Sequence, residues 1–123
     1  MSLTMLPSLQ TSIASGVSVS PVLDLGGKAL VAIITPAVMS GAKFFFNAGM
    51  DSLALAPLFD TGTTPAEVEV PYAVDAAQHI ALNADLSSYF RGLRYLQLVT
   101  VDGAGDPANQ GAARTITLVV REE

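Results

Sequence analysis

The chain has 123 residues, enough to bury one hydrophobic core and too few for two ordinary domains. Half of the residues are hydrophobic and only 14% are charged, so we expect other subunits or another protein to cover part of an apolar surface. The net charge of -5 disfavours binding to nucleic acid or anionic lipid, and the absence of cysteine excludes disulfides, thiol nucleophiles and cysteine-ligated zinc.

Residues 1–14 predict an N-terminal arm, because this stretch is too rich in Ser and Thr for a clear strand and too apolar for a solvated tail. We expect residues 15–123 to form a single domain. No charged side chain precedes Asp24, so the basic start of a secretory signal is missing and we expect no cleavage.

The most apolar stretch, residues 29–42, is shorter than the roughly 20 residues that span a bilayer. Pro36 and Gly41 also interrupt it. We therefore expect a buried strand and a turn there, and no membrane partner.

Short apolar runs separated by Gly, Pro, Asn and Asp are typical of strands joined by turns. The expected strands lie at residues 16–22, 28–34, 42–48, 52–59, 66–74, 77–83, 93–101 and 114–120. About eight short strands at regular spacing indicate an antiparallel sandwich, a jelly roll or a small barrel. We favour an all-β fold, an antiparallel β-sandwich of jelly-roll type. Residues 85–90 predict one helical turn with Asp85 as its N-cap.

Two of the expected strands are apolar on both faces. In residues 28–34, alternation places Leu30, Ala32 and Ile34 opposite Ala29, Val31 and Ile33. In residues 93–101, it places Leu96 and Leu98 opposite Leu93, Tyr95, Val99 and Val101. Since only one face of each sheet meets the core of a sandwich, the second face predicts contact between subunits.

Residues 66–74 have the alternation of a half-buried strand. Val68, Val70 and Tyr72 point one way, while Glu67 and Glu69 point the other. Pro71 cannot donate to a β-ladder, so it predicts a sheet edge or a bulge. In residues 44–46, the same alternation sends Phe44 and Phe46 to the core and Phe45 to a subunit contact.

The chain contains no recognisable catalytic motif. His79 is the sole histidine, and its apolar neighbours favour a structural or interface role over general base catalysis. Asp102 and Asp106 lie in a glycine-rich loop that resembles a calcium loop but lacks its third acidic residue and its closing Glu. We expect no catalytic, cofactor or metal site, and no enzymatic activity.

The stretch "SSYFRGLRYLQLVT" combines arginines with aromatic residues, as a nucleic-acid-binding patch would. Arg91 and Arg94 precede or open a strand, and Arg114 opens its expected hairpin partner across residues 102–113. In a protein of net charge -5, three cations near one sheet end favour contacts with carboxylates or loop carbonyls over phosphates.

The order "ITPAV", "FFFNAGMD", "YFRGLRYLQLVT" and "PANQGAARTITLVV" resembles a family of small head-associated proteins of tailed bacteriophages, over residues 23–121. The matching residues are Phe90, Gly92, Arg94, Tyr95, Leu98, Asn109, Gln110, Arg114 and Thr115. The sequence departs from the family at Asp51-Ser52, where Asp-Gly is usual, and in a shortened loop, "LFDTGTTP".

The resemblance implies a structural virion protein, a capsid decoration (cement) protein or the base of a head fibre. It would be made in the host cytoplasm and lie on the capsid exterior. Its partners would be itself, with a trimer favoured, and the major capsid protein or another virion protein. The predicted interface residues are Leu3, Met5, Leu6, Leu9, Phe45, Leu96, Leu98 and Arg94. The alternative is a non-catalytic β-sandwich module that recognises a glycan or peptide through its loops, such as residues 47–51 together with 101–111.

Overall fold

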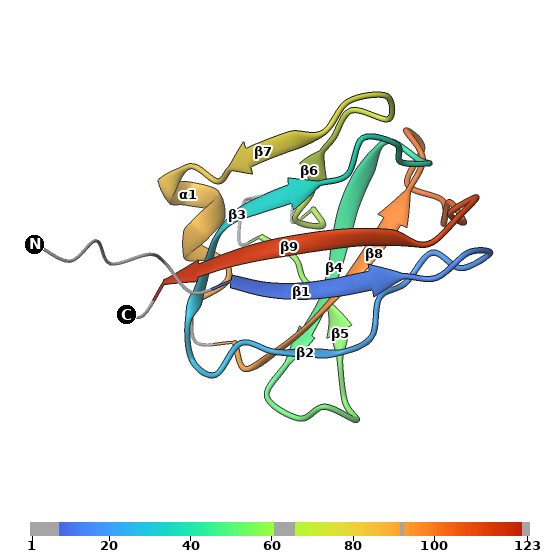
Figure 1. The fold of residues 1–123 in the computed structure, drawn as a ribbon. Coiled ribbons are helices and arrows are strands. Elements are labelled where there is room, and N and C mark those ends of the chain that lie inside the picture. The colour runs from blue at the N-terminus through green and yellow to red at the C-terminus, as the bar shows by residue number, and fades with distance from the viewer. Residues whose placement is uncertain (1–7, 61–65, 92, 122–123) are drawn as a thin grey trace, which may run out of the picture.

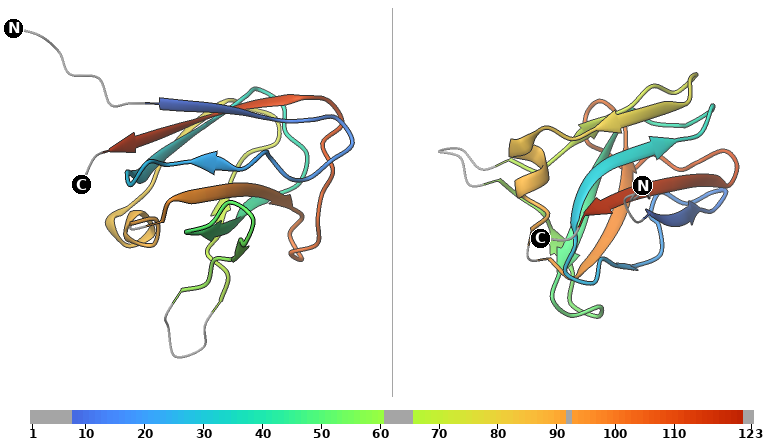
Figure 2. Two further views of the ribbon diagram at one scale, coloured as in Figure 1. Left: turned by 90° about the horizontal axis from the view of Figure 1, so that it is seen from below. Right: turned by 60° about the vertical axis from the view of Figure 1, so that its left-hand side comes forward.

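The structure, a computed structural model, describes residues 8–60, 66–91 and 93–121, which form two antiparallel sheets packed face to face (Figure 1; Figure 2, left). The four-stranded sheet has the order β1 (Ser8–Ile13), β9 (Arg114–Arg121), β3 (Ala29–Thr35), β7 (Gln78–Ala81). The five-stranded sheet contains β2 (Leu23–Asp24), β8 (Tyr95–Val101), β4 (Lys43–Gly49) and β5 (Ala56–Pro57), and β6 (Val70–Pro71) also pairs with β4. The predicted antiparallel β-sandwich is confirmed, while its jelly-roll character stays a prediction.

The core lies between the two sheets, where alternate side chains of their longer strands point inward. In the five-stranded sheet Phe44, Phe46, Leu96 and Leu98 are at most 1% exposed, and the Phe46 ring packs edge-on against Phe90 with centroids 4.9 Å apart. The four-stranded sheet contributes a second group of fully buried side chains: Leu30, Ile33, Ile116 and Leu118. The predicted inward orientation of Phe44 and Phe46 is therefore confirmed.

Strand β3 departs from the alternation predicted for it. Its register against β9 shifts between Leu30 and Ala32, which marks a β-bulge. The extra residue brings both Leu30 and Ile33 into the core, although simple alternation places them on opposite faces. Val31 and Ile34 remain only partly covered. The predicted grouping of Leu30 with Ile34 was thus wrong, but β3 is a central strand as expected.

The first described residues belong to the sandwich and not to an arm. Ser8–Ile13 pair with β9 in continuous register, from Ser8 opposite Val119 to Ile13 opposite Arg114. Ile13 is fully buried, because its side chain faces the core. The predicted boundary at residue 14 is therefore wrong for residues 8–13, and residues 1–7 lie outside the described residues.

Strands β8 and β9 do not form the predicted hairpin. β8 pairs with β2 and β4 in one sheet, whereas β9 pairs with β1 and β3 in the other. The loop between them, residues 102–113, therefore crosses from one layer of the sandwich to the other.

Several shorter segments refine the predicted boundaries. The stretch 66–74 contributes only β6 as a strand, yet Val68, Val70 and Tyr72 are buried as predicted. Pro71 lies in β6, which within the described residues pairs only with β4, so the expected edge position is confirmed. The helix α1 (Ala84–Ser88) is capped by Asn83, whose side chain accepts the Leu86 N–H at 2.8 Å. Asp85 is inside the helix, so its predicted role as N-cap was wrong.

Candidate functional site

The outer face of the four-stranded sheet presents partly covered apolar side chains to the outside. Val31 and Ile34 of β3 and Val119 of β9 lie on this face and are neither buried nor fully exposed. With the inner face filled by the core, β3 is apolar on both sides, as the sequence predicted for residues 28–34, whereas the outer face of β9 combines Val119 with Thr115 and Thr117. A sheet packed against only one other layer normally shows polar side chains on its outer face, so this face has the character of a contact surface.

The same face is hollowed. Its depression has a volume of about 460 Å³ and draws residues from all four strands. The lining residues are Ser8, Val31, Ala32, Ile34, His79, Thr117 and Val119. Apolar side chains form the floor, and Ser8 and His79 from the two edge strands stand at opposite sides. His79 is exposed and contributes to this surface, consistent with the structural or interface role predicted for it.

Charge is almost absent from this sheet. Its four strands contain two charged residues, Arg114 and Arg121, which are the first and last residues of β9. All 11 acidic residues lie elsewhere in the sequence. The four strands that form this hollowed face therefore carry no carboxylate, and their charges are confined to the two ends of β9.

Six of the eight predicted interface residues fall into three groups. Leu3, Met5 and Leu6 lie outside the described residues. Leu9 is partly buried and packs against the chain's own core. Leu96 and Leu98 are 0% exposed inside the sandwich, so their predicted interface role was wrong. The inner side of β8 is covered by the opposite sheet of the same chain, not by a second subunit.

Phe45 points away from the core as predicted and remains partly exposed on the five-stranded sheet. Its ring is flanked by its own chain: Lys43 Nζ lies 5.4 Å from the ring centroid, and a Cβ atom at Gly105 would be 3.6 Å from two ring carbons. Lys43 also forms an ion pair of 2.7 Å with Glu69. Phe45 thus belongs to a local cluster that already covers part of its surface.

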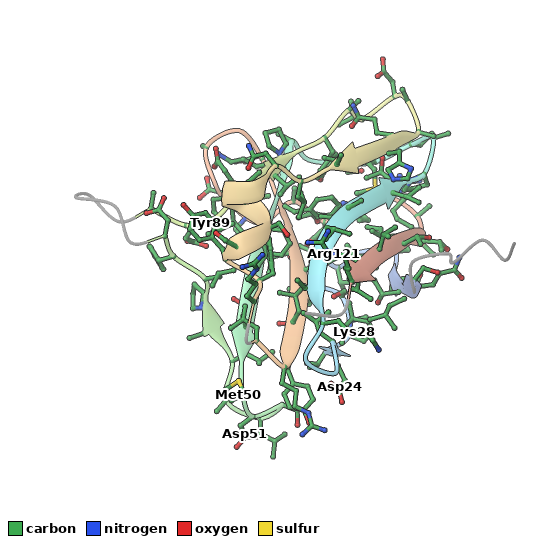
Figure 3. All side chains as sticks on the ribbon, turned by 90° about the vertical axis from the view of Figure 1, so that its left-hand side faces the viewer. Asp24, Lys28, Met50, Asp51, Tyr89 and Arg121 are labelled. Carbon is green, nitrogen blue, oxygen red and sulfur yellow. The ribbon has the colours of Figure 1, made fainter. Side chains whose placement is uncertain are left out.

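Arg94 is bound within the chain. Its guanidinium lies 3.4 Å from the Asp24 carboxylate and 5.2 Å from the Tyr95 ring centroid. The backbone N–H of Gly26, and then Arg94, lower the pKa of Asp24. Asp24 and Met50 lie at the same end of the molecule (Figure 3), where both Met50 and Arg94 line a hollow of about 330 Å³. The arrangement supports the structural interpretation of Arg94.

The arginines do not gather at one sheet end. Arg94 directly precedes β8, whereas Arg114 donates to the side chain of Gln110, which in turn contacts Thr100 near the end of β8. Arg94 and Arg114 therefore lie at opposite ends of that strand, and the predicted cluster of three cations was wrong. The reason is the length of β8, because Arg94 precedes its first residue and Arg114 follows the loop that leaves its last residue.

A buried polar cluster around Gln110 was not recognised as such from the sequence. Gln110 is 1% exposed, and its amide oxygen accepts from the Ser40 N–H and from Arg114 Nε. Its amide nitrogen donates to the Ser40 carbonyl and to Thr100 Oγ1. The only sign in the sequence is the match of Gln110 and Arg114 to the phage family pattern. Since both polar atoms of the Gln110 side chain have partners, this residue holds the loops together.

The loops named for glycan or peptide recognition are far apart. β4 and β8 run antiparallel, with Gly49 opposite Tyr95 and Lys43 opposite Val101. Residues 47–51 therefore lie at the end of the sheet where β8 begins, and the loop after Val101 lies at the other end. A single binding site built from both loops, as predicted, is wrong.

The Asp102 carboxylate stabilises the turn of its own loop, residues 102–106. Asp102 Oδ1 accepts the backbone N–H groups of Ala104 and Asp106, at 2.9 Å and 3.1 Å. Among the described residues, no group of three or more His, Asp or Glu side chains is close enough to hold a metal ion. In the same part of the chain, no helix is long and apolar enough to cross a membrane.

Comparison with known proteins yields no match to a protein-family model, to a curated protein or to a solved structure.

Proposed function

We propose that the protein is a structural virion protein, which self-associates and seats the outer face of its four-stranded sheet on the outer surface of a capsid. The observation that carries this proposal is the apolar, hollowed face bounded by Val31, Ile34 and Val119, on a sheet whose charges are confined to the two ends of β9. The resemblance to tailed-phage head proteins supports a capsid as the partner.

The physical basis is burial of apolar area without loss of charge hydration. Covering apolar surface contributes roughly 25 cal/mol per Å² to the favourable free energy of binding. The loss of translational and rotational freedom on association offsets a large part of this gain. Desolvating a charged side chain would cost several kcal/mol more, and this face has its charges only at its ends. The acidic residues elsewhere keep the protein soluble before assembly.

The proposal assigns a mechanical role, with no catalytic step and no cofactor. Catalysis requires an activated nucleophile or an acid and base that converge on one site. Several described carboxylates instead stabilise turns or form ion pairs, as Asp102 and Glu69 do. A hydrolase screen on the pure protein is expected to give no activity.

Binding to capsids tests the proposed function. The protein would be mixed with capsids assembled without it, from the phage that encodes it, and bound protein measured by co-sedimentation and electron microscopy. Val119→Lys places a charge on the apolar face and is expected to weaken binding at least about tenfold. The matched control is Val38→Lys, since Val38 is 55% exposed and outside the four strands.

Wild-type protein and the Val38→Lys variant are expected to decorate the particles. Absence of wild-type binding would overturn the capsid role, and equal binding of the Val119→Lys variant would overturn the assignment of the face. A glycan array on the same preparation addresses the alternative binding module, because specific glycan binding is not expected of a decoration protein.

A further inference from the structure

Strand β1 leaves one complete edge of the four-stranded sheet unpaired. It is the terminal strand in the order β1-β9-β3-β7, and in the described part of the chain only β9 pairs with it. Alternate residues of an edge strand direct their N–H and C=O groups away from the sheet. About three residues of β1 therefore offer both a donor and an acceptor to a further strand.

The edge also lacks the features that normally prevent such pairing. Natural edge strands are protected by being short, or by lysine, proline or a bulge. β1 has six residues, "SLQTSI", with no charge and no proline, and its register against β9 is continuous. The other described edge strands are shorter: β7 has four residues, and β2, β5 and β6 have two each. β1 is thus the longest and least protected edge among the described strands.

We propose that β1 pairs antiparallel with β1 of a second copy, about a two-fold axis perpendicular to the sheet, so that two four-stranded sheets join into one of eight strands. This inference rests on the proposed self-association and names the surface that mediates it. It also replaces the trimer implied by the family resemblance with a dimer, because a two-fold axis through one edge relates only two chains.

Side-chain alternation limits the possible registers. Residues directly opposite each other in an antiparallel pair have side chains on the same face. Ser8, Gln10 and Ser12 are exposed on the outer face, whereas Thr11 and Ile13 are buried toward the core. At the two-fold axis, one residue must therefore lie directly opposite the same residue of the second copy. The two registers with the greatest overlap place Gln10 opposite Gln10 or Thr11 opposite Thr11.

The structure favours a second copy as the occupant for two reasons. An antiparallel strand is its own complement about a two-fold axis, so one edge supplies both partners. The β1 edge carries no charge, while all 11 acidic residues lie outside the sheet, so two copies meet there without opposing carboxylates on the paired strands. The joined sheets would also present two outer faces side by side to a capsid, each with its charges confined to the ends of β9.

A charge exchange at Gln10 tests the pairing. Gln10 is exposed, and its side chain makes one long contact, 3.5 Å to Thr117 Oγ1, so substitution leaves the folded monomer intact. In the Gln10-centred register the two copies of residue 10 are directly opposite, and in the Thr11-centred register they are diagonal neighbours, roughly 7–8 Å apart. Gln10→Lys and Gln10→Glu are each expected to weaken the dimer about tenfold, and an equimolar mixture is expected to restore it as a heterodimer.

The measurement is light scattering after size exclusion over a range of protein concentrations, with native mass spectrometry of the mixture and circular dichroism to confirm folding. Thr115→Lys is the matched control: Thr115 is also exposed on the outer face, one strand further in. It is expected to leave the dimer unchanged.

The cysteine-free chain permits a second readout. Gln10→Cys is expected to form an intermolecular disulfide under mild oxidation, and Thr115→Cys is not. A monomeric or trimeric wild-type protein, a dimer unaffected by Gln10→Lys, or a mixture without heterodimer would overturn the inference. Its failure is distinguishable from that of the proposed function, because capsid binding is measured separately and depends on Val119.

Discussion

The side-chain amide of Gln110 is hydrogen-bonded to both backbone groups of Ser40, accepting its N–H and donating to its C=O at 2.9 Å each. The contact joins residues 70 positions apart in the sequence. The side-chain amide of Gln110 makes the two hydrogen bonds to Ser40 that a backbone partner would make in a β-ladder. Gln110 also reaches Thr100 in β8 and Arg114 at the start of β9. A single buried residue therefore connects two loops to strands of both sheets.

Gln110→Ala is expected to destabilise the protein by about 2–4 kcal/mol. It leaves the Ser40 N–H and Arg114 Nε without this acceptor, and it leaves the Ser40 C=O with the Tyr72 hydroxyl in place of two donors. The free energy of unfolding would be measured by urea denaturation. Asn109→Ala is the control: this neighbouring side chain is exposed, and the change is expected to stay within about 0.5 kcal/mol. Equal effects of the two substitutions would contradict a structural role for the cluster.

Gly41 adopts a positive φ of 98°, and a Cβ atom there would lie 2.7 Å from Tyr72 Oη and 2.9 Å from the Val101 carbonyl oxygen. Gly41→Ala is therefore expected to lower the melting temperature through both backbone strain and steric overlap, with a loss of about 2 kcal/mol or more. Gly103→Ala serves as the comparison, since Gly103 has no positive φ and nothing lies within 4 Å of its Cβ position. Its melting temperature is expected to change little or to rise.

Leu98 is fully buried between the sheets, so Leu98→Ala is expected to reduce the free energy of unfolding by about 2–5 kcal/mol through lost burial and a residual cavity. Leu53→Ala makes the same chemical change at a side chain that is 94% exposed and is expected to have almost no effect. Chemical denaturation monitored by circular dichroism would measure both. A stable Leu98→Ala monomer with impaired self-association would restore Leu98 as an interface residue.

Burial raises the pKa of the Tyr72 hydroxyl from 10.0 to about 12. The unfolded chain therefore releases this proton at lower pH than the folded protein does. The corresponding stabilisation is fully present below pH 10 and is lost as the pH rises from 10 to 12. Denaturation curves across this range should show a smaller alkaline loss for Tyr72→Phe than for wild type, whereas Tyr89→Phe retains the full loss. Identical profiles for wild type and Tyr72→Phe would contradict the raised pKa.

Alternation along single strands was sufficient to predict much of the core. It assigned Phe44, Phe46, Val68 and Val70 to the buried side, because each strand has a period of two. Glu67 and Glu69 mark the solvent side of the second pair. The same pattern failed in β3, where a bulge adds one residue to the period. Nothing in "KALVAII" signals that bulge, since all its candidate positions are apolar.

The antiparallel all-β class and the central position of β3 follow from composition, turn residues and the period of the apolar side chains, which are local properties of the chain. Which strands pair depends instead on contacts between distant residues, because backbone hydrogen bonds are the same for every sequence and do not encode a partner. Only the folded chain therefore showed that β8 and β9 lie in different sheets, that residues 8–13 form an edge strand, and that Leu98 packs inside while Val119 remains outside. The surface proposed for assembly arises from that pairing, which joins four strands without acidic residues into one sheet.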